Sequence, residues 1–550
     1  MLGLVVFSVV PLFALILWSR MAVPDWRIAG VHAALAWAAG IAVITELLSL
    51  FHALHFRPVL AVWLVVNAVA LMLVRRRVRR PVRPAPGGPW EVVFAAALAA
   101  LVALALVVAV VAPPNTPDVL AYHLPRQLMW LQQGGVQHFI TSDERALMMP
   151  PLAEMMQAHA LLLSGGDRWA NLPQWLAYVL GMIVASLLAR ELGAGRRAQW
   201  LAAFVFATIP MAWHEATSAK NDLLVAVWLG VWAWLALNLS QAERPALGDW
   251  LAAGAALGVS LATKTTALLF CVAPLAVLLP AAFRGRRRAW LIPALALLIA
   301  GPHAARNAAW YGTPLGQQPA AEGGGQGAEI ISLRAAASNG LRNATLHLAT
   351  PSPAINARLH RLVDRAHRWI GQDPDDRRTT LWFLRYGVDW GPQHEAIAGA
   401  PAQFMLGLGV LLVWLARRAW HGPTLRALLI VAAGVALCCI ALKWQPAGAR
   451  LHLPAFVVLA PLIAWAAEGF GFAGFMAVTL ASFAAWLPAS ETLLRPWRTA
   501  PTIFAASRWE NYFRHHPRER FYVEKSLAAL AAAQPKTLQI VSRHGFPYPL

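Results

Sequence analysis

Long apolar blocks recur along almost the whole chain, and they restrict its fold more than any other feature. Many of them run for about 17–23 residues, the length of helix that crosses a hydrocarbon core of roughly 30 Å. Backbone polar groups inside lipid must be satisfied within the protein, so repeated blocks of this kind predict spanning helices. The sequence therefore predicts an all-α polytopic membrane protein with about fourteen transmembrane helices.

The composition agrees with this class and excludes others. Charged residues make up 13% of the chain and hydrophobic residues 59%, whereas soluble domains carry about 25% charged residues. The net charge of +20 is explained by arginines in short loops, so no nucleic-acid partner is expected. All three cysteines lie inside apolar segments and provide no disulfide framework or metal motif.

Basic residues are distributed unevenly between the two sides of the membrane. One set of alternating short loops carries most of them, including six arginines in 75–83, whereas the opposite loops carry few. Short basic loops stay in the cytoplasm, so the N-terminus and the long segments 113–170, 304–401 and 489–550 are predicted to lie outside. This topology predicts that the long loops lie outside the cytoplasm. The expected location is a bacterial inner membrane, where that side is the periplasm.

Three regions follow from this pattern. Residues 1–89 contain three helices and the linker VRPAPGGP, residues 90–488 form a larger transmembrane core, and residues 489–550 form a small outer segment. The C-terminal segment includes a helical stretch near 518–533 and the strand-like sequence TLQIVSR. No internal repeat is evident.

The outer segment 113–170 predicts two helices that lie along the membrane surface. In 119–133, leucines form one stripe, while His123, Gln127 and Trp130 fall on the other face. Pro125 either kinks this helix or marks its start. The pair Pro150–Pro151 opens a second helix. Helices with one apolar stripe between two spans are expected at the interface.

Asp118 is the leading catalytic candidate because it follows the preceding apolar helix by only a few residues. A carboxylate at this depth can act as a general base that takes a proton from an acceptor hydroxyl. The alternative is structural, since Asp is a good N-cap for the helix that begins at 119.

Further acidic residues occur in the same segment. Asp143 and Glu144 precede Arg145 and are candidates to bind a metal or a sugar, or to pair with this arginine in a surface turn. Glu154, at the start of the second helix, either contacts a sugar hydroxyl or interacts with the helix N-terminus.

Lysines at the ends of apolar segments are candidates to bind a phosphate. Lys220 and Asp222 lie in HEATSAKND, and Lys264 lies in ATKTT. Ionisable groups near membrane depth are rare and often functional, and a cation there can stabilise the negative charge of a departing phosphate. Snorkelling of the lysines to the interface is the alternative.

Two arginines extend this set. Arg306, in PHAARNAAWYG, is predicted just beyond a helix, and Arg450, in KWQPAGARLHLP, just before one. Arginine binds phosphate bidentately, so the basic residues can converge on one outer cavity. His52 and His55, the sequence DPDDRR and the pair His515–His516 are weak metal motifs, and no metal or other cofactor is expected.

These features together resemble the integral-membrane glycosyltransferases of the GT-C superfamily, in particular the protein O-mannosyltransferases and the aminoarabinose transferases. The resemblance covers roughly residues 90–488. It rests on an outer loop with NTPDVLAYHLPR directly after a membrane helix, on the two interface helices, on SAKND and LATKTTALL, and on ARLHLP.

The resemblance implies an enzyme that transfers a sugar from a polyprenyl-phosphate donor to an acceptor hydroxyl, with inversion. Asp118 would be the catalytic base, His123 and Arg126 would position substrates, and Lys264, Arg306 and Arg450 would contact the donor phosphate. The acceptor would be a glycan, a lipid or a protein. A transporter or flippase of lipid-linked glycans is the alternative, although the polar residues cluster at helix ends rather than at mid-membrane.

Overall fold

The computed structural model is built from helices. It describes the chain except for residues 1, 21–24, 76–87, 286, 317–324, 382, 392, 535–547 and 549–550. Within these described ranges there is no β-strand, and only two isolated β-bridges occur. The predicted all-α class is therefore confirmed. The linker VRPAPGGP and the strand-like TLQIVSR lie almost entirely outside the described residues.

Eight helices are long and apolar enough to cross a membrane, and they are α2 (Trp26–Leu50), α3 (Phe56–Arg75), α4 (Pro89–Val111), α8 (Leu172–Glu191), α11 (Asp222–Gln241), α19 (Pro423–Ala441), α20 (Leu453–Glu468) and α21 (Gly471–Ala489). Two of them, α8 and α20, are extended at their starts by the 3-10 turns η3 (Asp167–Trp169) and η4 (Pro446–His452). Four shorter apolar helices are α1 (Val5–Arg20), α12 (Leu247–Thr263), α14 (Val272–Gly285) and α18 (Pro401–Ala416). The predicted number of about fourteen spans is not established by these lengths.

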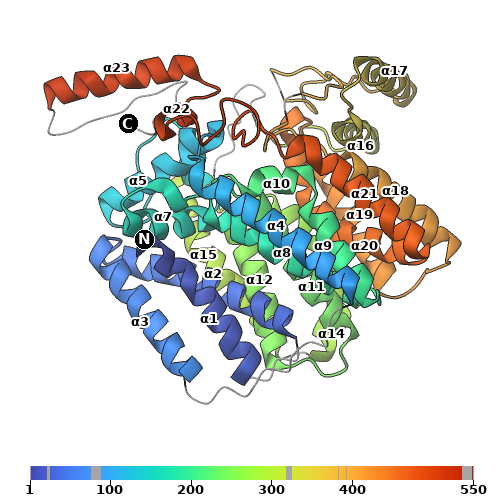
Figure 1. The fold of residues 1–550 in the computed structure, drawn as a ribbon, viewed down its shortest axis with the longest axis horizontal. Coiled ribbons are helices and arrows are strands. Elements are labelled where there is room, and N and C mark those ends of the chain that lie inside the picture. The colour runs from blue at the N-terminus through green and yellow to red at the C-terminus, as the bar shows by residue number, and fades with distance from the viewer. Residues whose placement is uncertain are drawn as a thin grey trace.

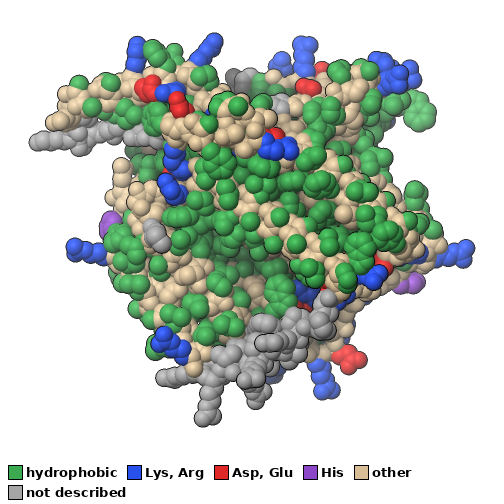
Figure 2. All heavy atoms as spheres, viewed as in Figure 1, with side chains coloured by type: hydrophobic (Ala, Val, Ile, Leu, Met, Phe, Trp, Pro, Cys, Tyr) green, Lys and Arg blue, Asp and Glu red, His purple; other side chains and the backbone are tan. Residues whose placement is uncertain are grey.

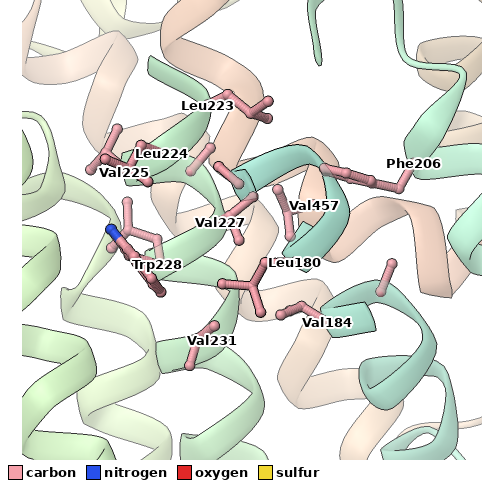
Figure 3. Packing of buried hydrophobic residues seen from close by; sticks show 14 of the residues in the cluster. Leu180, Val184, Phe206, Leu223, Leu224, Val225, Val227, Trp228, Val231 and Val457 are labelled. Atoms are coloured by element: carbon pink, nitrogen blue, oxygen red, sulfur yellow. The ribbon is translucent and has the colours of Figure 1, made fainter. Parts of the chain in front are cut away.

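The centre of the molecule is a bundle around α11 and α20. Most of the apolar stretch of each of these two helices is buried, whereas α3 and α21 expose most of theirs. A helix that is hydrophobic on all sides suits such a central position. Gly230 allows close packing here, since a Cβ atom at this position would clash with Val457 Cγ1. Figure 3 shows Val227, Val457 and Val184 meeting at this junction.

The N-terminal helices α1, α2 and α3 pack together at one side of the bundle (Figure 1). Trp37 of α2 donates a hydrogen bond of 2.8 Å to the carbonyl of Val6. Trp63 of α3 donates one of 3.0 Å to His159, which belongs to α7 (Leu152–Ser164). The N-terminal region is therefore joined to the outer loop as well as to the membrane core.

Shorter helices cover one end of the bundle, and these are η2 (Val119–His123), α5 (Leu124–Gln133), α6 (Arg145–Met148), α7, α10 (Pro210–Ala216), α16 (Leu333–Leu348), α17 (Pro353–Ile370), α22 (Arg508–Tyr512) and α23 (Pro517–Ala533). In Figure 1, α16, α17, α22 and α23 gather at the upper end, opposite the lower ends of α3 and α14. We call this the outer end. The remaining helices are η1 (Leu2–Leu4), α9 (Arg196–Ala207), α13 (Ala267–Phe270) and α15 (Leu291–Tyr311).

Proline positions explain several helix starts. Pro125 is the second residue of α5, and Pro173 occupies the same position in α8. Proline is tolerated in the first turn because the missing N–H has no partner within the helix there. Pro125 follows the single turn of π-helix η2 without a break, so it marks the start of α5.

Two features differ from the sequence-based expectation. The helix α15 continues through Pro302 to Tyr311, so Arg306 lies inside its last turns rather than beyond its end. In addition, the polar face of η2 and α5, with His123, Gln127 and Trp130, is buried as fully as Leu120 and Leu124. This polar face contacts α7, where Gln127 donates a hydrogen bond of 2.6 Å to Gln157.

Candidate active site

Asp118 stands between the end of α4 and the start of η2, at the outer end of the bundle. Although it occupies the N-cap position, its side chain makes no capping hydrogen bond. Its carboxylate instead accepts a hydrogen bond of 2.9 Å from Arg450 Nη1 and lies 3.6 Å from Lys220 Nζ. Arg145 Nη1 lies 3.5 Å from the other carboxylate oxygen. The side chain is therefore held by cations rather than used as a cap.

Asp222 supplies a second carboxylate to the same cluster. It is the first residue of α11 and is buried. Lys264 Nζ contacts one of its oxygens at 2.5 Å, while Lys220 Nζ and Arg450 Nη1 lie 3.8 and 4.0 Å from the other. Lys220 and Arg450 therefore bridge two carboxylates that are far apart in the sequence.

Glu215 is a third carboxylate beside Lys220. It lies in α10, is fully buried, and accepts a hydrogen bond of 2.8 Å from Gln174. Its other oxygen lies 3.7 Å from Lys220 Nζ. Burial raises the pKa of Glu215, and the positive charge of Lys220 only partly opposes this effect. Sequence analysis did not single out Glu215, although it stands in the same HEATSAKND stretch.

At Asp118, in contrast to Glu215, the nearby cations outweigh the effect of burial on the pKa. Burial disfavours its charged form, but the charges of Arg450 and Lys220 and the hydrogen bond from Arg450 outweigh burial. The pKa of Asp118 is therefore held well below its ordinary value. Burial also lowers the pKa of Lys264, and Asp222 opposes that shift. In this state, Asp118 is an ionised carboxylate and a weak proton acceptor.

Arg145 closes the outer side of the cluster. Its guanidinium lies over the ring of Tyr122 at 4.4 Å and pairs with Asp143 at 2.6 Å. Arg145 and Tyr122 were not among the predicted site residues. Glu144 is exposed just before α6. The structure thus shows the pairing in a surface turn that the sequence offered as one alternative for this acidic stretch.

His123, Arg126 and Glu154 form a separate buried cluster between α5 and α7. Glu154 Oε1 lies 2.8 Å from His123 Nδ1 and 3.5 Å from Arg126 Nη1. The guanidinium of Arg126 also lies 4.6 Å from the centre of the Trp130 ring. Burial on its own would raise the pKa of Glu154. The hydrogen bond and charge of His123 and the charge of Arg126 have the larger combined effect, so the pKa of Glu154 is lowered. These charges compensate one another and hold α5 on α7.

Arg306 is paired elsewhere. Its guanidinium contacts both carboxylate oxygens of Glu46 in α2, at 2.6 and 2.8 Å. This bidentate pair joins α15 to the N-terminal helices. No ion pair within 4 Å joins Arg306 to the Asp118 cluster in the described part of the chain. The structure therefore brings Lys220, Lys264 and Arg450 together, while Arg306 lies apart from them.

Hydrogen bonds from distant segments fix the loop around Asp118. Asn115 donates to the carbonyls of Leu494 and Asn511 at 2.8 and 2.9 Å. Gln157 donates to the carbonyl of Ala219 at 2.8 Å, directly before Lys220. The outer loop, the HEATSAKND stretch and the C-terminal segment therefore position one another.

The cluster combines ionised carboxylates with cations that are suited to an anion. Lys220 and Arg450 already contact carboxylates, and arginine and lysine bind phosphate through the same donors. No group of three or more His, Cys, Asp or Glu side chains that could hold a metal ion occurs among the residues whose positions are described.

Comparisons with known proteins agree with the resemblance predicted from the sequence. A family model for dolichyl-phosphate-mannose-protein mannosyltransferase matches residues 148–306 and confirms that resemblance over this part of the chain. The matched part contains Glu154, Lys220, Asp222, Lys264 and Arg306, whereas Asp118 and Arg450 lie outside it. No curated protein matches the chain.

Two solved structures are similar at low sequence identity. One is ArnT from Cupriavidus metallidurans bound to undecaprenyl phosphate, with 18% identity, coverage of 81% of this chain and 72% of that chain, and a TM-score of 0.45. The other is the archaeal oligosaccharyltransferase AglB from Archaeoglobus fulgidus in complex with an inhibitory peptide and a dolichol-phosphate, with 15% identity, coverage of 82% and 61%, and a TM-score of 0.45.

Proposed function

We propose that this protein is a membrane glycosyltransferase that moves a sugar from a polyprenyl-phosphate donor to an acceptor hydroxyl. The observation that carries the proposal is the convergence of Lys220 and Arg450 on Asp118 at the outer end of the helix bundle. The description of the matching family, which names dolichyl-phosphate-mannose, supports a lipid-phosphate donor.

In the proposed reaction, Asp118 takes the proton of the acceptor hydroxyl as its oxygen attacks the anomeric carbon. A new carbon–oxygen bond forms on one face of the sugar, and the bond to the phosphate oxygen breaks on the other face. The bonding electrons leave with the polyprenyl phosphate, so the anomeric configuration is inverted. A positioned base of this kind contributes about 10²–10⁴-fold to the rate.

The cations have two roles in this proposal. Lys220 and Arg450 bind the donor phosphate and stabilise its growing charge as the sugar leaves. When the side chains of Lys220 and Arg450 move from Asp118 to the phosphate, they no longer lower the pKa of the Asp118 carboxylate. Donor binding therefore converts Asp118 from a weak base into a stronger one. Asp222 contacts both cations in the ligand-free state.

The orientation of the protein supports a periplasmic reaction. Arg190, Arg284 and Arg417, which belong to the predicted arginine-rich short loops, stand at the helix ends opposite Asp118, and such loops remain in the cytoplasm. The donor would then be used after its transfer to the outer leaflet. His123, Arg126 and Glu154 support the outer loop from behind, and Asp143 and Glu144 lie at its surface towards the acceptor.

The test compares purified wild type with Asp118→Asn in lipid nanodiscs, using a panel of polyprenyl-phosphate sugars and membrane extracts as acceptors. We expect the variant to lose about 10²-fold or more of the transfer rate while it still binds the donor. Asp364→Asn is a matched control, because Asp364 lies on α17 away from the cluster. Undiminished transfer by a folded Asp118→Asn variant would exclude Asp118 as the base.

The same preparation separates this activity from transport. For this purpose the wild-type protein is placed in sealed vesicles. If it moves a lipid-linked glycan between leaflets but forms no new glycosidic bond from any donor in the panel, the protein is a flippase. Product analysis by NMR decides the stereochemical course, since inversion gives the opposite anomeric configuration from that of the donor.

A further inference from the structure

A second polar site lies at the opposite end of the bundle from Asp118. A pocket of about 230 Å³ opens between the first residues of α4, α9 and α21 and the last residue of α20. These helix ends meet where the spans α4 and α21 enter the membrane. In Figure 2, hydrophobic side chains cover much of the middle of the face that carries α4 and α21. The pocket therefore opens at a boundary between lipid and water.

Aromatic side chains form the membrane-facing wall of this pocket. The ring of Trp90 lies 5.5 Å from that of Phe472 and 6.5 Å from that of Phe475. Trp90 and Phe472 are 39% and 63% exposed, so both rings are accessible from the surrounding lipid. Tryptophan is enriched at this depth in membrane proteins. The wall suits the upper part of an acyl chain.

Two charged side chains of opposite sign line the same pocket and do not pair with each other. Arg197 is exposed, and within the described ranges it has no hydrogen bond or ion pair. Glu468 accepts hydrogen bonds of 3.0 and 3.2 Å from the backbone N–H of Gly195, but no cation within 4 Å pairs with it in the described structure. A carboxylate with these two contacts still has lone pairs available.

This arrangement is complementary to a zwitterion. The guanidinium of Arg197 can bind a phosphate, and the carboxylate of Glu468 can accept hydrogen bonds from a primary ammonium. A phospholipid with a phosphoethanolamine headgroup carries both groups close together, next to acyl chains that suit the aromatic wall. A choline headgroup has no N–H to donate to Glu468, and a purely anionic headgroup would meet its negative charge.

We propose that the pocket lined by Trp90, Arg197, Glu468 and Phe472 binds a phospholipid with a phosphoethanolamine headgroup, whose phosphate contacts Arg197 and whose ammonium contacts Glu468. The site is independent of the glycosyl-transfer reaction. It joins α4, which leads into the Asp118 loop, to α20, which follows Arg450, and a lipid bound there bridges these two helices at their other ends.

The test measures lipid retention by native mass spectrometry. The full chain, purified in detergent, is incubated with equal amounts of phosphatidylethanolamine, phosphatidylcholine and phosphatidylglycerol. One charged headgroup contact corresponds to about a fivefold change in binding, so we expect about fivefold more phosphatidylethanolamine than phosphatidylcholine. Arg197→Ala should reduce retention of all three lipids, and Glu468→Gln should remove the preference over phosphatidylcholine.

Arg287→Ala is the matched control, because Arg287 is also exposed but does not line the pocket. Equal retention of the three lipids by wild type would overturn the proposal, as would a preference that survives both pocket substitutions. Soluble phosphoethanolamine that competes as strongly as the lipid would overturn the assignment of a membrane lipid. Thermal unfolding verifies that each variant is folded, and Phe472→Ala, which leaves both charges in place, tests the aromatic wall if Arg197→Ala does not fold.

Discussion

The guanidinium of Arg450 donates a hydrogen bond of 2.9 Å to the carboxylate of Asp118, across a separation of 332 residues. The same guanidinium lies 4.0 Å from Asp222. One side chain therefore neutralises two carboxylates that come from the first outer loop and from the start of a central helix.

Replacement of Arg450 by Gln should weaken both donor binding and the fold. Loss of these part-buried, charge-assisted contacts should lower the free energy of unfolding by about 1–3 kcal/mol, and loss of a phosphate contact is expected to raise the KM for the donor by about tenfold or more. Arg417→Gln is the control, because Arg417 donates to backbone carbonyls at the other end of the bundle. Donor titrations and thermal unfolding measure the two effects, and an unchanged KM would remove Arg450 from the donor site.

The pH dependence should distinguish free enzyme from the donor complex. The pKa of Asp118 is lowered in the free protein, so its charge contributes stability above the ordinary value of 3.8 that is lost only as the pH falls through the lower folded value. We expect no acid limb from Asp118 in kcat/KM between about pH 5 and 8, but an acid limb in kcat at saturating donor. Identical acid limbs in both profiles would contradict the proposed exchange of cations.

The pH dependence of stability that comes from Glu215 should be opposite in sign to that from Asp118. Its pKa is raised above the ordinary value of 4.5 by burial, so the unfolded chain loses this proton at lower pH than the folded chain does. Stability must then decrease as the pH rises above about 4.5, until the folded group also ionises. Glu215→Gln keeps an acceptor for Gln174 and should reduce this decrease. Unfolding midpoints from pH 5 to 9 measure the difference, and parallel curves would show that Glu215 does not titrate as inferred.

Glu154 should be structurally critical. It is fully buried and is the carboxylate partner of both His123 and Arg126. Glu154→Ala leaves Arg126 as a buried cation without this carboxylate, at a cost of about 3–5 kcal/mol, whereas Glu154→Gln retains an acceptor and should cost less. Denaturant unfolding in detergent compares the two variants. Equal stability of wild type and Glu154→Ala would show that the cluster contributes little.

The Arg306–Glu46 pair can be tested by exchange of its charges. Glu46→Arg places two cations together and should loosen the N-terminal helices from α15, whereas the double variant Glu46→Arg/Arg306→Glu should recover part of the loss, by about 1 kcal/mol or more. Limited proteolysis between α3 and α4 reports the attachment. Failure of the double variant to recover any stability would show that the bidentate geometry in this orientation is essential.

The sequence predicted the helical class and several members of the polar cluster because both depend on local signals. Apolar block length identifies a span, and a charge at the end of an apolar segment identifies a boundary position. Asp118, Lys220, Lys264 and Arg450 all carried that signal. The catalytic and donor-binding roles assigned to these residues remain predictions.

What the sequence could not supply was the choice of partners. Arg306 carries the same local signal as Arg450, but its partner is Glu46, in a region to which the sequence assigned no role. Glu215 and Arg145 join the cluster through contacts with Lys220 and Asp118, and no spacing rule relates these positions. The end of α15 was misplaced because a proline within a helix resembles a stop when neighbouring helices are unknown.

The hydrogen bonds of Asn115 with Leu494 and Asn511 have a consequence for biogenesis. The chain emerges from the ribosome N-terminus first, so Asp118 enters the membrane long before Arg450 and the segment near 494–511 are synthesised. The loop that carries Asp118 can be closed only after the segment near 494–511 has been synthesised. A nascent chain therefore carries its acidic loop through the addition of 379 further residues without the groups that complete it.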